Sequence, residues 1–231
     1  QGAPQVAYKE SFGTTINHRE VLKKQSGGRG KFADIQFEIG PADAEWLKEN
    51  EGKSFQFVND LFGGSIPKEF VPAILKGFET SMTSGVLAGY PVNNMKVRVF
   101  DGSYHDVDSD AMSFELCAKA GFREAGRKAK PTLLEPIMKV EVLTPDQYMG
   151  DVTGDLNRRR GMLEGMDSRA NLQVIKAKVP LSEMFGYVTQ LRSLSSGRAT
   201  STMEFSHYNP APNNVAEEVM AKNKGKVKSD D

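Results

Sequence analysis

The chain has 231 residues, of which 39% are hydrophobic and 26% are charged, proportions typical of a soluble globular protein of one large or two ordinary domains. No apolar run approaches the length that spans a bilayer. Lysine plus arginine balance aspartate plus glutamate at 30 each, so the formal net charge is zero. A protein that holds nucleic acid through bulk charge is usually strongly basic, so any RNA contact here must depend on local patches and shape.

The first part of the chain is predicted to be extended. Residues 6–39 form strands interrupted by a glycine-rich bend at 26–31. After the bend, apolar residues alternate with polar ones over 33–39, a period of two that is typical of a strand with one buried face. Phe55 and Phe57 begin another short strand.

A helix and a strand are expected next. Pro67 and Pro72 stand where a helix can begin, because the first turn leaves its N–H groups unpaired in any case. The apolar stripe that follows predicts a helix over 71–86. Met95–Phe100 is predicted to be a strand.

A second helix is expected after Ser109 or Asp110, either of which can cap it. Its apolar stripe runs from Phe114 to Ala125 and includes Cys117. Because Cys117 is the only cysteine, no internal disulfide can form, which fits a reducing compartment. We interpret it as a small core residue rather than as a nucleophile.

The second half of the chain repeats one supersecondary unit, after a proline-containing segment at 128–136 that we interpret as a linker. The pattern predicts strands at 137–143 and 174–179, helices at 146–160 and 182–196, and returning strands at 162–166 and 200–207. Strand–helix–strand twice over is the split βαβ arrangement of a ferredoxin-like domain. The polar, lysine-rich tail from about residue 222 is predicted to be disordered.

Matching residues mark the two copies of the repeat. They are the expected N-caps Asp146 and Ser182, the helix glycines Gly150 and Gly186, and the expected C-caps Gly161 and Gly197. Because glycine weakens a helix interior, its presence at the same place twice indicates close packing against the sheet. The sequence therefore predicts an α+β protein with two domains, at 1–130 and 131–231.

The familiar enzyme motifs are incomplete. Gly52–Ser54 resembles the end of a phosphate-binding loop, but Leu47 stands where that loop requires glycine. The alternating aspartates at 106–110 resemble the start of a calcium loop, but Ala111 and Cys117 replace its glycine and its bidentate glutamate. The three histidines are too scattered to indicate a zinc site. We expect neither a bound metal nor a catalytic residue.

Two loops and one helix end have side chains suited to RNA. In the 26–31 loop, glycines permit close backbone approach and Arg29 and Lys31 suit phosphate oxygens, although a plain hairpin turn is the alternative. The 101–108 loop places an aromatic residue and His105, side chains that can stack on bases or donate to RNA, in an acidic turn, although the residues taken alone favour a helix-capping turn. Arg158–Arg160 complements the dipole of a helix end, but three adjacent arginines also suit an RNA surface.

Several stretches taken together resemble elongation factor G over nearly the whole chain. They are Gln5–Glu10, Ser26–Gly30, Leu87–Val92, Asp101–Ser109, Leu134–Val140, Gly150–Val152 with Gly154–Leu156, Arg158–Gly161, Pro180–Val188, and Leu191–Ser193 with Gly197–Ala199. They are similar to the last two domains of that family, numbered four and five. The resemblance implies an elongated ribosomal-protein-like α/β module followed by a ferredoxin-like domain.

The resemblance also implies where RNA is contacted. The tip of domain four enters the decoding region of the small ribosomal subunit, and the matching tip residues here are Ser26, Gly27, Gly28, Arg29, Gly30, Lys31, Tyr104, His105 and Asp106. Many family members have glutamine in place of Lys31, so a role that depends on that amide does not transfer. Domain five lies near the sarcin–ricin loop and the stalk base of the large subunit, which Arg158, Arg159 and Arg160 would face.

By this resemblance, the chain is expected to be the C-terminal part of a ribosomal translocase that couples GTP hydrolysis to movement of tRNA and mRNA. GTP and Mg²⁺ belong to an N-terminal domain outside this sequence, so the chain itself would not be an enzyme and would need no cofactor. We expect a cytoplasmic monomer with no membrane contact. The alternatives are a paralogue acting in ribosome recycling or ribosomal protection, or an unrelated enzyme with an unseen site.

Overall fold

The computed structural model describes residues 7–25, 28 and 30–226, which form two compact units. The first unit contains Lys9–Leu133 together with residues 211–226, and the second contains residues 7–8 together with Leu134–Pro210. The sequence boundary placed everything after residue 130 in one domain, whereas the C-terminal segment groups with the first unit. A hydrogen bond of 3.4 Å from the Asn223 side chain to the Tyr90 hydroxyl anchors it there.

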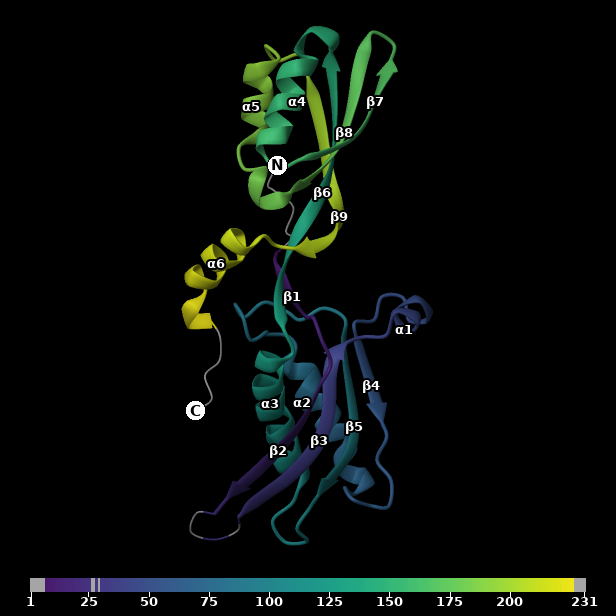
Figure 1. Ribbon diagram of the computed structural model, residues 1–231, viewed down its shortest axis with the longest axis vertical. Coiled ribbons are helices and arrows are strands. Elements are labelled where there is room, and N and C mark those ends of the chain that lie inside the picture. The colour runs from purple at the N-terminus through teal and green to yellow at the C-terminus, as the bar shows by residue number, and fades with distance from the viewer. Residues whose placement is uncertain (1–6, 26–27, 29, 227–231) are drawn as a thin grey trace. The chain divides into compact units, whose positions relative to one another are not determined.

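The first unit is a four-stranded sheet covered on one face by two helices (Figure 1). Its elements are β1 (Lys9–Phe12), β2 (Ile16–Lys24), β3 (Lys31–Pro41), α1 (Ala44–Glu49), β4 (Phe55–Asn59), α2 (Val71–Ser81), β5 (Met95–Ser103), α3 (Ala111–Lys128) and α6 (Asn213–Lys222). The strand order is β2-β3-β5-β4, in which only β4 and β5 pair in parallel.

The core of this unit lies between the sheet and helices α2 and α3. The alternation predicted for β3 is confirmed, because Ala33, Ile35, Phe37 and Ile39 are all fully buried. Helix α2 ends at Ser81, earlier than the apolar stripe predicted. The predicted cap of α3 is confirmed at Asp110, whose side chain accepts a hydrogen bond from the Ser113 N–H.

Cys117 is a core residue, as predicted. It is fully buried on α3, and its thiol donates a hydrogen bond of 3.3 Å to the Glu20 carbonyl. Burial raises the pKa of the Cys117 thiol to about 12, so the reactive thiolate is absent near neutral pH.

The second unit has the predicted βαββαβ order. Its elements are β6 (Pro131–Pro145), α4 (Met149–Arg158), β7 (Met162–Arg169), β8 (Leu172–Pro180), α5 (Tyr187–Leu194) and β9 (Thr200–Pro210). The antiparallel order β7-β8-β6-β9 is that of a ferredoxin-like sheet, and both helices lie on one face (Figure 1). β6 begins within the first unit and also pairs with β1. The α+β fold class is therefore confirmed.

The segment predicted to be a linker is wrong, because residues 131–136 already belong to β6. Pro136 lies opposite Tyr208 of β9, and the pairing of β6 with β8 starts only at the next residue, Ile137. A strand can accept proline where its missing N–H faces no neighbour. Two prolines were thus a poor sign of a linker.

The helix starts in the repeat also differ from the prediction. A short 3₁₀ turn precedes each helix, at Asp146–Tyr148 and Leu181–Glu183, and neither Asp146 nor Ser182 makes a side-chain cap. Gly186 has φ of +71° just before α5, a conformation that favours glycine. A Cβ on Gly150 would meet nothing within 4 Å, so close packing does not explain that glycine.

The helices end near the predicted positions, but their C-caps are Arg159 and Ser195 and not Gly161 and Gly197, which lie two residues further on. The N–H groups of Gly161 and Gly197 donate to the carbonyls of Leu156 and Arg192, five residues back, as in a Schellman motif. The disorder predicted from residue 222 is wrong at its start, because α6 includes Lys222 and a 3₁₀ turn covers Lys224–Lys226. The rest of the tail lies outside the described residues.

A buried carboxylate that the sequence did not reveal organises the loop after α2. Glu10 in β1 is 1% exposed, and its two oxygens accept hydrogen bonds from the N–H groups of Leu87, Ala88 and Tyr90 at 2.9–3.0 Å. A Cβ on Gly85 would collide with this carboxylate. Two of the stretches that resemble the family, one around Glu10 and one around Tyr90, are therefore joined to each other by these hydrogen bonds.

We expect Glu10→Ala to lower the free energy of unfolding of the first unit by about 3 kcal/mol, because three donors lose a charged acceptor in a buried place. Urea denaturation followed by fluorescence of Trp46, the single tryptophan, measures this unit directly. The control is Glu45→Ala, an exposed change expected to stay within about 0.5 kcal/mol. Equal effects of the two variants would contradict the role of Glu10.

Candidate nucleic-acid interface

Two loops meet at one end of the first unit. The β2–β3 register runs from Ile16 opposite Ile39 to Lys24 opposite Lys31, so residues 25–30 close the hairpin. The second loop joins β5 to α3 and contacts the hairpin through a hydrogen bond of 2.9 Å from the Phe32 N–H to the Asp108 carbonyl. The structure therefore brings together the two loops that the sequence singled out separately.

The described part of the hairpin loop requires glycine. Gly28 is exposed with φ of +152°, and a Cβ on Gly30 would lie 2.9 Å from the Lys24 carbonyl and 3.4 Å from the Asp108 carboxyl carbon. Both glycines thus allow a tight loop beside its neighbour. Three predicted tip residues, Ser26, Gly27 and Arg29, lie outside the described residues.

Ser109 ties the second loop to β3. It is 7% exposed, its hydroxyl donates to the Phe32 carbonyl at 2.8 Å, and it accepts from the His105 N–H at 2.9 Å. The Ser109 N–H in turn donates to the His105 carbonyl at 3.0 Å. Asp110, the next residue, caps α3, so the loop is fixed at its helical end as well.

His105 is exposed, as predicted, but it does not stand alone. Its imidazole stacks on Phe32 with ring centroids 3.7 Å apart and planes 7° from parallel. Phe32 was not among the predicted tip residues, although the sequence has a signal for it: it lies on the polar face of the β3 alternation, with Asp34 and Gln36, where an aromatic is unexpected.

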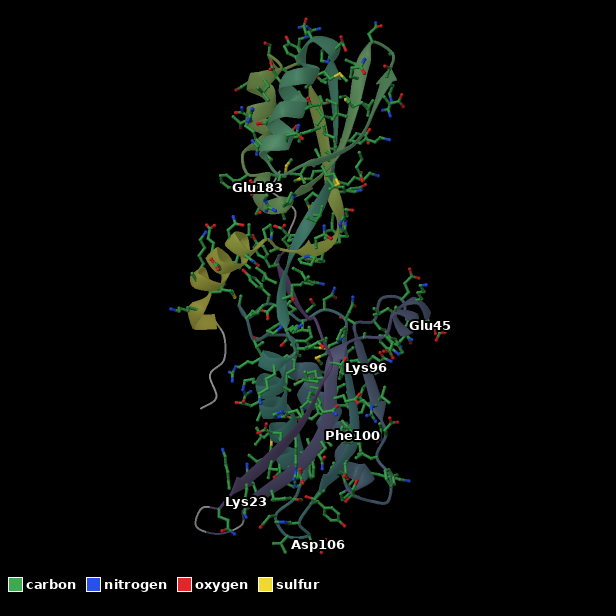
Figure 2. All side chains as sticks on the ribbon, viewed as in Figure 1. Lys23, Glu45, Lys96, Phe100, Asp106 and Glu183 are labelled. Carbon is green, nitrogen blue, oxygen red and sulfur yellow. The ribbon has the colours of Figure 1, made fainter. Side chains whose placement is uncertain are left out.

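The remaining tip side chains are open to solvent. Tyr104 is 40% exposed, and Asp106 and Lys31 are exposed. Two further lysines, Lys23 and Lys24, precede the bend and were also missed, although a lysine pair beside a glycine loop is a visible signal. Figure 2 shows Lys23 and Asp106 at the same end of the unit.

The tip lysines have no ion-pair partner among the described residues. Lys24 and Lys31 lie directly opposite one another across the hairpin, and like charges in that position are unfavourable. An anionic ligand would remove this repulsion. The hairpin end is therefore a local basic patch on a chain of zero net charge.

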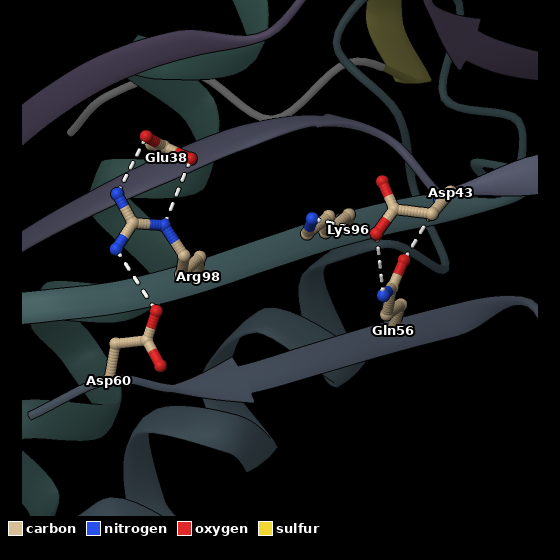
Figure 3. Close-up of polar contacts among 6 residues, drawn as sticks. All are labelled: Glu38, Asp43, Gln56, Asp60, Lys96 and Arg98. Carbon is tan, nitrogen blue, oxygen red and sulfur yellow. Dashed lines mark hydrogen bonds and ion pairs between the residues drawn. The ribbon is translucent and has the colours of Figure 1, made fainter. Parts of the chain in front are cut away.

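The open face of the same sheet is different, because its cations are neutralised within the chain (Figure 3). Arg98 forms ion pairs with Glu38 at 2.7 Å and with Asp60 at 3.1 Å, and these hydrogen bonds raise the pKa of the Arg98 guanidinium. Lys96 pairs with Asp43 at 2.8 Å, and Gln56 also donates to that carboxylate. This face offers little net charge to a polyanion.

The three arginines at the end of α4 have different environments. Arg159 is 16% exposed, forms an ion pair with Asp155 at 3.0 Å, and donates to the carbonyls of Glu183 and Phe185. Arg160 holds the buried Glu135 carboxylate through two hydrogen bonds of 2.9 and 3.0 Å and also pairs with Glu183. Arg158 is 68% exposed, with a single contact of 3.5 Å to Asp155.

Two of the three predicted contacts to the large subunit are thus occupied by contacts inside the second unit. Arg158 is the member whose guanidinium is open to an RNA phosphate. Elsewhere in the described part of the chain, no group of three or more histidine, cysteine or acidic side chains is arranged to hold a metal ion. No helix within those same residues is long and apolar enough to cross a membrane.

Comparison with known proteins agrees with this arrangement. Residues 4–130 match the family model described as "Elongation factor G, domain IV", and residues 132–219 match "Elongation factor G C-terminus". These two matches cover the first unit, with its two adjoining loops, and the ferredoxin-like second unit. The chain is therefore one of the translation elongation factors. It belongs to the elongation factor G family.

Individual relatives support the same assignment. Proteins named elongation factor G from Cytophaga hutchinsonii and Amoebophilus asiaticus are 61% and 57% identical over 225 residues, which are 97% of this chain and 31% of each relative. A crystal structure of a protein from Thermus thermophilus matches with a TM-score of 0.82 and 35% identity, over 97% of this chain and 32% of that one. The chain therefore spans about a third of the length of these relatives.

The arginine environments make a testable distinction. We expect Arg160→Ala to lower the free energy of unfolding by about 3 kcal/mol, because the Glu135 carboxylate remains buried without its partner; one-third exposure of Arg160 keeps the effect at the low end. Arg158→Ala, the matched control, is expected to change it by less than about 0.5 kcal/mol. Calorimetric unfolding of both variants checks this. A stable Arg160→Ala protein would mean that Arg160 has no structural role.

Proposed function

We propose that this chain is the ribosome-contacting part of a GTP-hydrolysing translocase, and that the two-loop tip contacts RNA in the decoding region of the small subunit. The observation that supports this most directly is the tip itself, where lysines without an ion-pair partner among the described residues and an exposed imidazole lie on two loops that contact each other. Lysine suits phosphate oxygens, while imidazole and phenol rings stack on unpaired bases. Both kinds of contact are what a tRNA–mRNA complex offers.

The scaffold suits a mechanical role. β2 and β3, of nine and eleven residues, form a continuous antiparallel hairpin, and α2 and α3 cover one face of its sheet. A strand of nine residues extends roughly 30 Å, so the loop is held well away from the opposite edge of the unit. An arm of this kind occupies space rather than performing chemistry, and it would bias which ribosome state is populated.

The second unit would face the large subunit, near the sarcin–ricin loop and the stalk base, with Arg158 as the available guanidinium. GTP and Mg²⁺ would be held by the rest of the parent protein, which would act as a cytoplasmic monomer. The alternative is a paralogue specialised in ribosome recycling or ribosomal protection. Translocation and ribosome-splitting assays on the parent distinguish these activities.

We expect His105→Ala in the parent to slow single-round translocation by roughly tenfold and to leave ribosome-stimulated GTP hydrolysis nearly unchanged. A contact worth about 1.4 kcal/mol at the barrier gives that factor. The matched control is His207→Ala, which removes the same side chain from β9 of the second unit. Normal translocation with lost GTP hydrolysis would sink the assignment of the tip.

An enzyme that binds nucleotide through this chain is the rival from another class. The candidate phosphate loop singled out in the sequence is committed to the fold, because the Ser54 hydroxyl accepts from the Asn94 N–H at 2.7 Å and lies 3.3 Å from the Asn93 side-chain oxygen. We therefore expect calorimetric titration of the 231-residue chain with GTP or GDP to show no binding. Micromolar affinity for either nucleotide would favour the enzyme.

A further inference from the structure

We propose that Phe32 and Ser109 are positioning residues for His105, and that together they fix the imidazole so that its open face stacks on one RNA base. This inference rests on the proposed function, since it assumes that the tip contacts RNA. It adds to that function a mechanism by which a short exposed loop presents one ring in one orientation.

Phe32 is the platform under the ring. The separation of 3.7 Å and the angle of 7° describe two rings in full face-to-face contact, so Phe32 covers one face of the imidazole. The Phe32 backbone is held by the same loop that it supports. Its N–H donates to the Asp108 carbonyl, and its carbonyl accepts from the Ser109 hydroxyl. The Phe32 backbone, from which the ring projects, therefore cannot shift without breaking contacts to the β5–α3 loop.

Ser109 connects the backbone of Phe32 to the backbone of His105. A hydroxyl has one donor and two acceptor sites, and here one of each is used, toward Phe32 in β3 and toward His105 in the loop. Because the oxygen is nearly buried, water cannot easily replace it. Alanine at this position would leave the His105 N–H and the Phe32 carbonyl without this partner.

The remaining surface of the imidazole is available. Among the described residues, neither ring nitrogen of His105 has a hydrogen-bond partner, and no aromatic ring other than Phe32 stacks on it. A flat ring with one face covered and one face open is a stacking surface for a single base. Fixing it before binding avoids the entropy cost of ordering an exposed side chain during binding.

The first experiment tests positioning in the 231-residue chain alone. NMR of the His105 ring protons is expected to show an upfield ring-current shift that Phe32→Leu removes and Phe32→Tyr retains. Ser109→Ala is expected to reduce this shift, and Ser109→Thr to restore it. The matched control is Ser195→Ala, because the Ser195 hydroxyl also bridges two backbone groups, Leu191 and Ala199, but in the second unit. Wild-type His105 signals without the shift would overturn the proposal.

The second experiment is a double-mutant cycle on single-round translocation by the parent. If Phe32 acts through His105, Phe32→Leu alone slows translocation by nearly the same factor as His105→Ala, roughly tenfold, and adds less than about twofold to His105→Ala. If the slowing factors of the two single substitutions multiply in the double variant, Phe32 acts independently of His105, and the proposal is overturned. GTP hydrolysis and the Ser195→Ala control are expected to stay unchanged throughout.

The two experiments separate this inference from the proposed function. If the ring-current shift is present but His105→Ala translocates normally, the RNA contact is wrong and the proposed function of the tip fails with it. If His105→Ala is slow but the shift is absent, the proposed function stands and the positioning role fails.

Discussion

The register of β3 is the constraint on which the first unit depends. Its alternate residues Ile35, Phe37 and Ile39 are buried against α2 and α3, and the residues between them lie on the opposite face of the sheet. A slip of one residue would turn every side chain to the other face. Phe32 would then point toward the core side, and His105 would lose its platform. Burial in the centre of the sheet thus determines the chemistry at its end.

Charge is distributed by the same geometry. On the open face of the sheet, Arg98 of β5 forms ion pairs with Glu38 of β3 and with Asp60, the residue that follows β4. At the hairpin end, the neighbour of a lysine is another lysine. Surface ion pairs contribute little to stability individually, so this difference matters mainly for binding. Among the described residues, it leaves the tip lysines without an ion-pair partner on a chain that has no net charge.

Periodicity predicted the elements well and their ends poorly. The β3 alternation and the duplicated strand–helix pattern correctly gave the sheet face, the βαββαβ order and the Asp110 cap, because these depend on burial and on local backbone groups. The segment around Pro136 was misjudged because strand pairing on one side only is a tertiary property. Gly150 and Gly186 looked equivalent in sequence, yet one lies within a helix and the other precedes one with positive φ.

The candidate site shows a similar division. Glycines, lysines and His105 could be singled out by residue type, whereas Ser109 and Glu10 could not, since each acts through a partner distant in sequence. For Arg158–Arg160 the error is the opposite one, because residue type suggested an RNA contact where two of the three side chains make contacts inside the unit. Arg160 has φ of +57°, an uncommon backbone conformation for a residue with a side chain. Its guanidinium holds Glu135 and Glu183, so the ion pairs offset the cost of that conformation where α4 gives way to β7. In the sequence alone, this arginine run suggests an RNA contact. In the structure, two of its three members form contacts within the second unit that hold the end of α4 in place.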